Sequence, residues 1–252
     1  MIDWFYPVLN WIDGGIGLWI PEFFRIILWG GLSGAGAILL YSWGSDQKGI
    51  SRIKEEIKNI RKRMFNPDLE KEEYFYYIRK NLFVSLTFLR KVSLPSFMAS
   101  IPVLINIFWI SAFFTFQLPP SGEKVSVKLF PEKNDVVAKP SEVFLRTSDG
   151  FLWVVGDDSE PLRFLDRKGL AFSWIPHLPV SGVVYKKKWW NWFVENEVGY
   201  IREDSPIDEI RWFYPRKVII DGVPEWMATW EFPYFATLFL TALGIKFFFR
   251  IQ

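Results

Sequence analysis

The sequence contains no cysteine and only one histidine, His177, among its 252 residues. Without cysteine the chain can form no disulfide framework, no thiolate metal site and no cysteine nucleophile. A single histidine excludes metal sites built from several imidazoles. The formal net charge is only +2, so we expect no strong attraction to nucleic acid across the whole molecule.

Signatures of catalysis are also missing. His177 has no Ser-centred elbow to accompany it, which leaves a Ser-His-Asp triad without support. Scattered acids in the second half have no Gly-spaced calcium loop around them, and ordinary turn chemistry accounts for them. These acids are Asp149, Asp157, Asp158 and Asp166. We therefore expect no enzyme, no metal and no cofactor.

Apolar residues make up 50% of the chain, and its 14 tryptophans are unusual for a soluble domain. Three long apolar segments have the length that a bilayer core requires, at about 23–43, 93–116 and 226–250. Within the first, Arg25 is the only charge, and the second has none. The sequence predicts an α-helical integral membrane protein with three transmembrane helices.

Residues 46–92, between the first two spans, predict a charged helical hairpin. Its first helix has an apolar seam at spacings of three and four, formed by Ile50, Ile53, Ile57, Ile60 and Met64. Asn66-Pro67-Asp68 then interrupts the seam and is typical of a new helix start. The second helix carries Phe75, Ile78, Leu82, Leu86 and Leu89 on roughly one face.

Residues 117–225 predict an inserted all-β domain, a small sandwich or barrel. Turn signals separate short β-prone runs at Val125–Phe130, Glu142–Arg146, Phe151–Val155, Val183–Tyr185, Gly199–Ile201 and Lys217–Ile220. Residues 1–22 lack the basic start of a signal peptide. Their tryptophans and tyrosine favour an interfacial segment at the headgroup level.

The distribution of charge orients these parts. Residues 46–91 hold twelve Lys and Arg against seven Asp and Glu, whereas residues 117–225 hold fifteen against seventeen. The first 22 residues hold three acids and no base. The positive-inside rule therefore places the hairpin and the C-terminus in the cytoplasm, and the N-terminus and β-domain outside. The membrane would be a prokaryotic inner or plasma membrane.

This order of parts resembles the YidC/Oxa/Alb membrane insertase superfamily, in particular its minimal three-span branch of archaeal YidC-like proteins and the third subunit of the ER membrane complex. The resemblance rests on Tyr41-Ser42-Trp43 leading into the basic helix Ile50–Arg63, and on the Pro-punctuated run Leu94–Pro102. An aromatic third span with Lys246 and Arg250 near its end also fits. The chain departs from the better-known members in its inserted β-domain. It also has no basic residue in the middle of its first span.

The resemblance implies a polar groove that lowers the cost of bringing hydrophilic residues into the bilayer. A charge at the bilayer centre costs about 2.5–3.5 kcal/mol even on permissive scales. The groove candidates are Arg25, Ser33, Ser100, Asn106, Ser111 and Thr241. Each has a simpler alternative: Arg25 as an interfacial anchor paired with Glu22, Asn106 as an interhelical hydrogen bond, and the hydroxyls as packing residues.

The resemblance also implies that the hairpin meets substrate or ribosome. Its basic cluster, Lys58, Arg61, Lys62 and Arg63, suits anionic lipid headgroups as well. The alternatives are a self-packed coiled coil or a docking surface for a partner subunit. In the β-domain, the run Lys186–Phe193 joins three lysines to aromatic residues. It favours a membrane surface or a protein interface over single-stranded nucleic acid.

Three functional hypotheses follow. The first is an insertase or chaperone that helps nascent membrane proteins to enter or fold in the bilayer. The alternative is a structural or assembly subunit of a larger membrane complex, with the hairpin and the β-domain as docking surfaces. The third is an extracytoplasmic binding module held by a three-span anchor.

Overall fold

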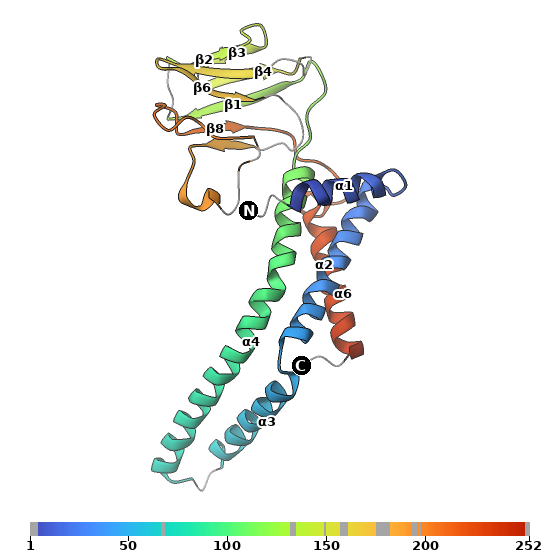
Figure 1. The fold of residues 1–252 in the computed structure, drawn as a ribbon, viewed down its shortest axis with the longest axis vertical. Coiled ribbons are helices and arrows are strands. Elements are labelled where there is room, and N and C mark those ends of the chain that lie inside the picture. Colours follow the sequence, from blue (N-terminus) through green and yellow to red (C-terminus); the bar gives the residue numbers. More distant parts are fainter. Residues whose placement is uncertain are drawn as a thin grey trace. The chain divides into compact units, whose positions relative to one another are not determined.

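A computed structural model describes residues 5–66, 69–131, 135–148, 150–156, 161–174, 182–192, 196 and 198–249. Within these residues, three helices are long and apolar enough to cross a membrane: α2 (Glu22–Gly44), α4 (Lys71–Phe114) and α6 (Glu231–Phe249) (Figure 1). A β-region is inserted between α4 and α6. The chain divides into two compact units, residues 1–25 with 107–232, and residues 26–106 with 233–252.

The hairpin lies in the second of these units and begins with α3 (Gln47–Met64). Asp46 caps this helix, since its carboxylate accepts the Gly49 N–H at 2.9 Å. The predicted apolar seam is the covered face of α3: Ile50 and Ile60 are buried, and the seam residues between and after them are half-buried. The first half of α4 lies beside α3 (Figure 1), with Lys80 paired to Glu56 at 3.8 Å.

The second hairpin helix and the second span are a single helix. α4 runs for 44 residues, about 66 Å at the rise of an α-helix, and passes through Pro95 and Pro102. The sequence predicted a boundary near residue 92. Ser93 could have capped a new helix there, but its hydroxyl donates to the Leu89 carbonyl at 2.7 Å instead. Proline is tolerated inside a spanning helix where neighbouring groups satisfy the backbone carbonyls that it frees, and α4 continues through both prolines.

Contacts within the second unit fix the directions of the three long helices. Ser33 meets Asn106, and Gly44 faces Pro95, so α2 and α4 are antiparallel. A Cβ built on Gly30 or Gly34 would meet the backbone carbonyl of Tyr234 or Leu238, respectively, so α2 and α6 are parallel. The hairpin and the last turn of α6 therefore lie at the same end of these helices.

The β-region belongs to the first unit and forms two sheets. The larger has the order β3-β4-β1-β8-β7 and the smaller β2-β5-β6, with antiparallel pairing between these strands. The strands are β1 (Lys124–Phe130), β2 (Val137–Lys139), β3 (Phe144–Thr147), β4 (Gly150–Val154), β5 (Leu162–Asp166), β6 (Gly169–Trp174), β7 (Val183–Tyr185) and β8 (Glu209–Trp212).

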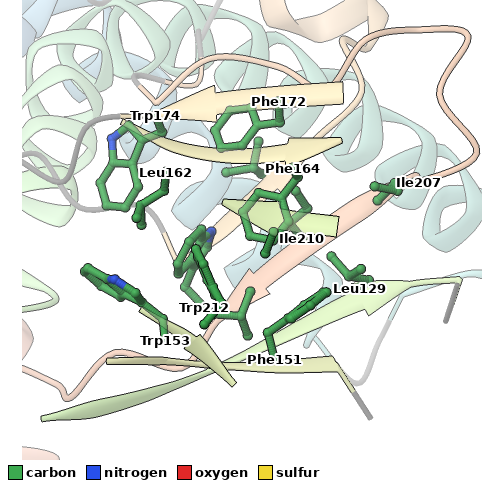
Figure 2. Close-up of a cluster of buried hydrophobic side chains, with 14 of the residues drawn as sticks. Leu129, Phe151, Trp153, Leu162, Phe164, Phe172, Trp174, Ile207, Ile210 and Trp212 are labelled. Atoms are coloured by element: carbon green, nitrogen blue, oxygen red, sulfur yellow. The ribbon is translucent and has the colours of Figure 1, made fainter. Parts of the chain in front are cut away.

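One aromatic cluster fills the space between the two sheets (Figure 2). Trp212 of β8 is its centre and lies edge-on to Trp153 of the same sheet at 5.7 Å between ring centroids. From the smaller sheet, Phe164 and Trp174 approach Trp212 at 5.7 and 5.5 Å. Edge-to-face rings at these distances are a favoured aromatic geometry, so aromatic pairs contribute to the packing of the two sheets.

Two predicted strands are wrong. Gly199 has a φ of +93°, which is incompatible with a regular strand, and Ile201 forms only an isolated bridge. The segment 217–220 instead turns onto α5 (Glu225–Ala228), with the N–H groups of Ile219 and Ile220 bonded to the Ala228 carbonyl. The strands β2, β5, β6 and β8 were not predicted. β2, β5 and β8 are short runs that include charged residues, which give little β signal.

Among the acids, Asp166 has a structural role at the end of β5. Its side chain has no exposed surface. Its carboxylate forms an ion pair with Arg202 at 3.1 Å and accepts a hydrogen bond from the Lys168 backbone N–H at 2.7 Å. Burial raises the pKa of this carboxyl. A hydrogen bond from Ser205, the Lys168 N–H and the charge of Arg202 outweigh that effect and hold the pKa below its ordinary value of 3.8.

A lowered folded-state pKa predicts an acid-sensitive β-region. The stabilisation from the Asp166 carboxylate is complete above the ordinary value of 3.8 and is lost as the pH falls through the lower folded pKa. Tryptophan fluorescence of the full chain in detergent, titrated with denaturant between pH 7 and pH 2, measures this loss. We expect Asp166→Asn to be less stable at pH 7 and to have a flatter pH profile. An unchanged profile in that variant would assign the acid sensitivity to other carboxyls.

Candidate functional site

The predicted groove residues are divided between the two compact units. Arg25 and Ser111 belong to the first, and Ser33, Ser100, Asn106 and Thr241 to the second.

In the second unit, Ser33 and Asn106 form one hydrogen-bonded cluster with Tyr234. The Ser33 hydroxyl receives Asn106 Nδ2 at 3.1 Å and the Tyr234 hydroxyl at 2.9 Å. One residue from each of α2, α4 and α6 thus meets at a single point. Asn106 Oδ1 is buried and accepts no hydrogen bond from the described residues. Interhelical bonds of this kind are worth about 0.6–2 kcal/mol each in membranes.

Sequence reasoning missed Tyr234. The signal was a tyrosine in the first turn of an otherwise apolar span, and the hydroxyl of a buried tyrosine usually finds a partner. Its role became visible only when the helix directions placed it opposite Ser33.

Two glycines bring α2 and α6 close together. A Cβ on Gly30 would lie 2.6 Å from the Tyr234 carbonyl oxygen, and one on Gly34 would be even closer to that of Leu238. Only glycine permits this approach, which is the packing that small-xxx-small spacing allows in membranes. Thr241 lies at the same interface, with its hydroxyl oxygen 3.6 Å from the position of a Cβ on Gly31.

The other two hydroxyl candidates form local contacts, within α4 or with the residue that follows it. Ser100 donates to the Phe97 carbonyl at 2.7 Å, and Ser111 is 3.4 Å from the Thr115 hydroxyl. Such local bonds satisfy a hydroxyl inside a helix without a second helix. For these two residues the geometry favours the local role.

In the first unit, Arg25 pairs with Asp13 of α1 (Tyr6–Gly17). The partner suggested by sequence proximity, Glu22, pairs with Lys217 instead. Both cations lie against the Phe114 ring, with Arg25 Cζ at 5.6 Å and Lys217 Nζ at 5.4 Å from its centroid. These contacts connect α1, the start of α2, the end of α4 and the segment after β8.

The polarity of α1 is inverted relative to a soluble amphipathic helix. Its polar side chains Asn10 and Asp13 face protein: Asn10 accepts the Trp109 indole N–H at 2.6 Å, and Asp13 accepts Arg25. Tyr6, on the same face, lies edge-on to Phe113 at 6.4 Å. The exposed side chains of α1 are apolar, with Trp11 80% exposed. The outer surface of α1 is therefore suited to an apolar medium.

The hairpin half of α4 has an uncovered apolar face. Tyr77, Val84 and Phe88 turn inward and are buried or half-buried, whereas the opposite side carries five large apolar residues that are 59–72% exposed. They are Phe75, Leu82, Phe83, Leu86 and Leu89, and we call them the outer face of α4. Four of them were in the predicted apolar row, so the hairpin closes through the other side of the helix.

The predicted basic residues Lys58, Arg61, Lys62 and Arg63 are all exposed on α3. The last three complement the negative C-terminal end of the helix, and Arg63 also reaches the Tyr77 hydroxyl at 3.4 Å. At the other end of α3, the Gly49 N–H and Lys91 hold the pKa of Asp46 below its ordinary value. This ties the start of α3 to α4.

In the β-region, the basic aromatic run begins with Lys186–Lys188 and continues as a short 3-10 helix, η2 (Trp189–Trp192). Asn191 is fully buried and holds this turn: its side chain receives the Lys188 N–H at 2.7 Å and donates to the Tyr185 hydroxyl at 3.1 Å. The indoles of Trp189 and Trp192 are exposed. Phe193, the last residue of the run, lies outside the described residues.

No cluster of three or more His, Asp or Glu side chains that could hold a metal occurs in the part of the chain that the structure describes. His177, Asp149, Asp157, Asp158 and Arg250 lie outside it. Comparisons of the chain with protein-family models, curated protein sequences and solved structures find no match.

Proposed function

We propose that this chain is a membrane-embedded insertase or chaperone, which binds other membrane proteins without covalent chemistry while they insert or fold. The observation that carries the proposal is the outer face of α4, an uncovered apolar surface on a helix that continues directly from a candidate span.

The position of this face along the helix argues against lipid as its permanent cover. Gly44, the last residue of α2, faces Pro95, so residues 71–94 of α4 extend past the end of that span. These 24 residues correspond to about 36 Å of helix. A continuous helix that projects this far from the bilayer keeps its apolar face outside the hydrocarbon core. Large exposed apolar patches on soluble surfaces usually mark protein contacts.

The charges on the hairpin support a cytoplasmic location. Its surplus of Lys and Arg is what the positive-inside rule associates with the cytoplasmic side of a membrane. With the hairpin there, the outer face of α4 would meet apolar segments before they enter the bilayer.

The Ser33–Asn106–Tyr234 cluster favours a second function, a structural subunit of a larger membrane assembly. In this cluster two of the six groove candidates bond to each other and to a third helix. Polar residues used in this way hold a bundle together rather than line an open path. The outer face of α4 would then bind one permanent partner.

Site-specific photocrosslinking in cells distinguishes the two functions. A photoreactive residue at Leu86 is expected to crosslink to several different nascent membrane proteins, and a second probe at Asn106 should capture the same proteins later in their insertion. A probe at Ser51, exposed on the polar surface of α3, is the matched control and should capture few of them. Crosslinks from Leu86 and Asn106 to a single stable protein would contradict the insertase proposal and support the structural one.

A further inference from the structure

An apolar groove lies between α1 and the turn that follows it. The groove has a volume of about 780 Å³ and is shallow and widely open. It lies within the first unit and is formed by Asn10, Trp11, Ile12, Gly14, Gly15, Ile16, Leu18, Trp19 and Ile20. None of these side chains is charged. Trp19, at its rim, is 87% exposed.

We propose that this groove is a binding site for a lipid acyl chain. The first reason is the inverted polarity of α1. The side chain of Asn10 is hydrogen-bonded to Trp109, and that of Asp13 is paired with Arg25. The remaining surface of α1 therefore offers a ligand almost only hydrocarbon and indole. Ligand pockets of this size are usually lined by apolar and aromatic side chains with a few polar groups that fix orientation.

The second reason is the level at which the groove lies. α1 is followed, after Leu18–Pro21, by α2, and Asp13 pairs with Arg25 in the first turns of that candidate span. The groove therefore lies at the edge of the apolar segment, where the acyl chains of a bilayer begin and where tryptophan is enriched.

The third reason separates an acyl chain from a lipid headgroup. Anionic headgroups are bound by clusters of Lys and Arg. The lining contains no cation, and Arg25 beside it is paired with Asp13. The groove thus recognises the hydrocarbon part of a lipid. The inference requires only that the chain is embedded in a membrane, so it does not depend on insertase activity.

The glycines of the groove provide a sharp test. Gly14 and Gly15 line the groove, and a Cβ on either would meet no atom within 4 Å, so leucine at both positions is expected to narrow the groove. Gly244 of α6 is equally open and lies outside the groove, so Gly244→Leu is the matched control. Leucine also favours a helix more than glycine does, which protects the fold of the variants.

The experiment uses the full chain in vesicles of phosphatidylcholine that contain a small fraction of a phosphatidylcholine with a diazirine in its acyl chain. After illumination, mass spectrometry should find saturable labelling of residues 10–20. We expect this labelling to fall at least five-fold in the Gly14→Leu/Gly15→Leu variant and to be unchanged in Gly244→Leu. A second probe with the diazirine on the headgroup should label the segment weakly.

Three results would overturn the proposal. Labelling that rises linearly with probe content and is unchanged in the Gly14→Leu/Gly15→Leu variant would indicate ordinary contact with bulk lipid. Labelling by the headgroup probe alone would place the wrong part of the lipid in the groove. Capture of a protein by a photoreactive residue at Trp19 in native membranes, with no acyl labelling of the segment, would make the groove a protein interface.

Discussion

Replacing Gly34 with leucine is expected to push α2 and α6 apart and to destabilise the helical unit by about 1–3 kcal/mol. The new side chain has no space, because even a Cβ at this position would collide with the backbone carbonyl of Leu238. A backbone atom cannot rotate away as a side chain can, so the helices themselves must separate. Their separation would also stretch the bond from Tyr234 to Ser33, which is 2.9 Å long.

Gly36→Leu is the matched control for this variant. Gly36 is two residues further along α2, and a Cβ there would meet nothing within 4 Å. Denaturation of the purified chain in detergent measures the loss of stability in both variants.

The lack of native cysteine allows a second, direct measurement of the same separation. Cysteines at Gly31 and Thr241 should form a disulfide in the parent chain, since these positions face each other across the α2/α6 interface. We expect this disulfide to form poorly when Gly34 is leucine. Equal stability of the Gly34 and Gly36 variants, with an unaffected disulfide, would contradict the close helix contact.

The second large effect is expected for Arg25→Ala, which would leave Asp13 without its cation. The two side chains are only 17% and 10% exposed, so the pair is largely removed from water. Removing one partner of such a pair typically costs about 3–5 kcal/mol, since the remaining charge stays buried and uncompensated. The contact with the Phe114 ring is lost as well. We expect α1 to detach from the start of α2.

Hydrogen exchange of residues 6–17 in the full chain measures this detachment, because an undocked α1 of 12 residues is too short to remain helical alone. Combining Arg25→Met with Asp13→Asn removes both charges and should recover most of the protection. Arg25→Lys should retain part of it, since lysine keeps the charge without the guanidinium fork. Protection that is unchanged in Arg25→Ala would show that packing of Tyr6 and Asn10 holds α1 without the ion pair.

Gly34→Leu and Arg25→Ala together allow the insertase proposal and the lipid-groove proposal to be tested independently. Gly34→Leu perturbs the helices that contain the polar cluster, whereas Arg25→Ala perturbs the support of the lipid groove. If acyl labelling is lost only in the Arg25 variant, and capture of membrane proteins at Leu86 is lost only in the Gly34 variant, the two activities reside in different units of the chain.

The sequence by itself determined the features that depend on local pattern. Three apolar segments were identified as candidate spans, because the thickness of a bilayer sets the number of consecutive apolar residues that a spanning helix needs. The spacing of three and four residues identified the covered face of α3 from Ile50 to Met64, since this spacing lies on one side of any α-helix. The change of pattern after the proline pair located the β-region.

The tertiary structure decided which partner each side chain meets. The sequence could not tell that α4 has two apolar sides, of which the one with Val84 is buried and the one with Leu86 is exposed, because both sides satisfy the same helical period. Nor could it pair Arg25 with Asp13 rather than with the nearer Glu22, or bring Tyr234 to Ser33 across 201 positions of the chain. Such choices depend on the directions and separations of whole helices. Gly30 and Gly34 of α2 set the direction and separation of α2 and α6, because they let the two backbones come into contact.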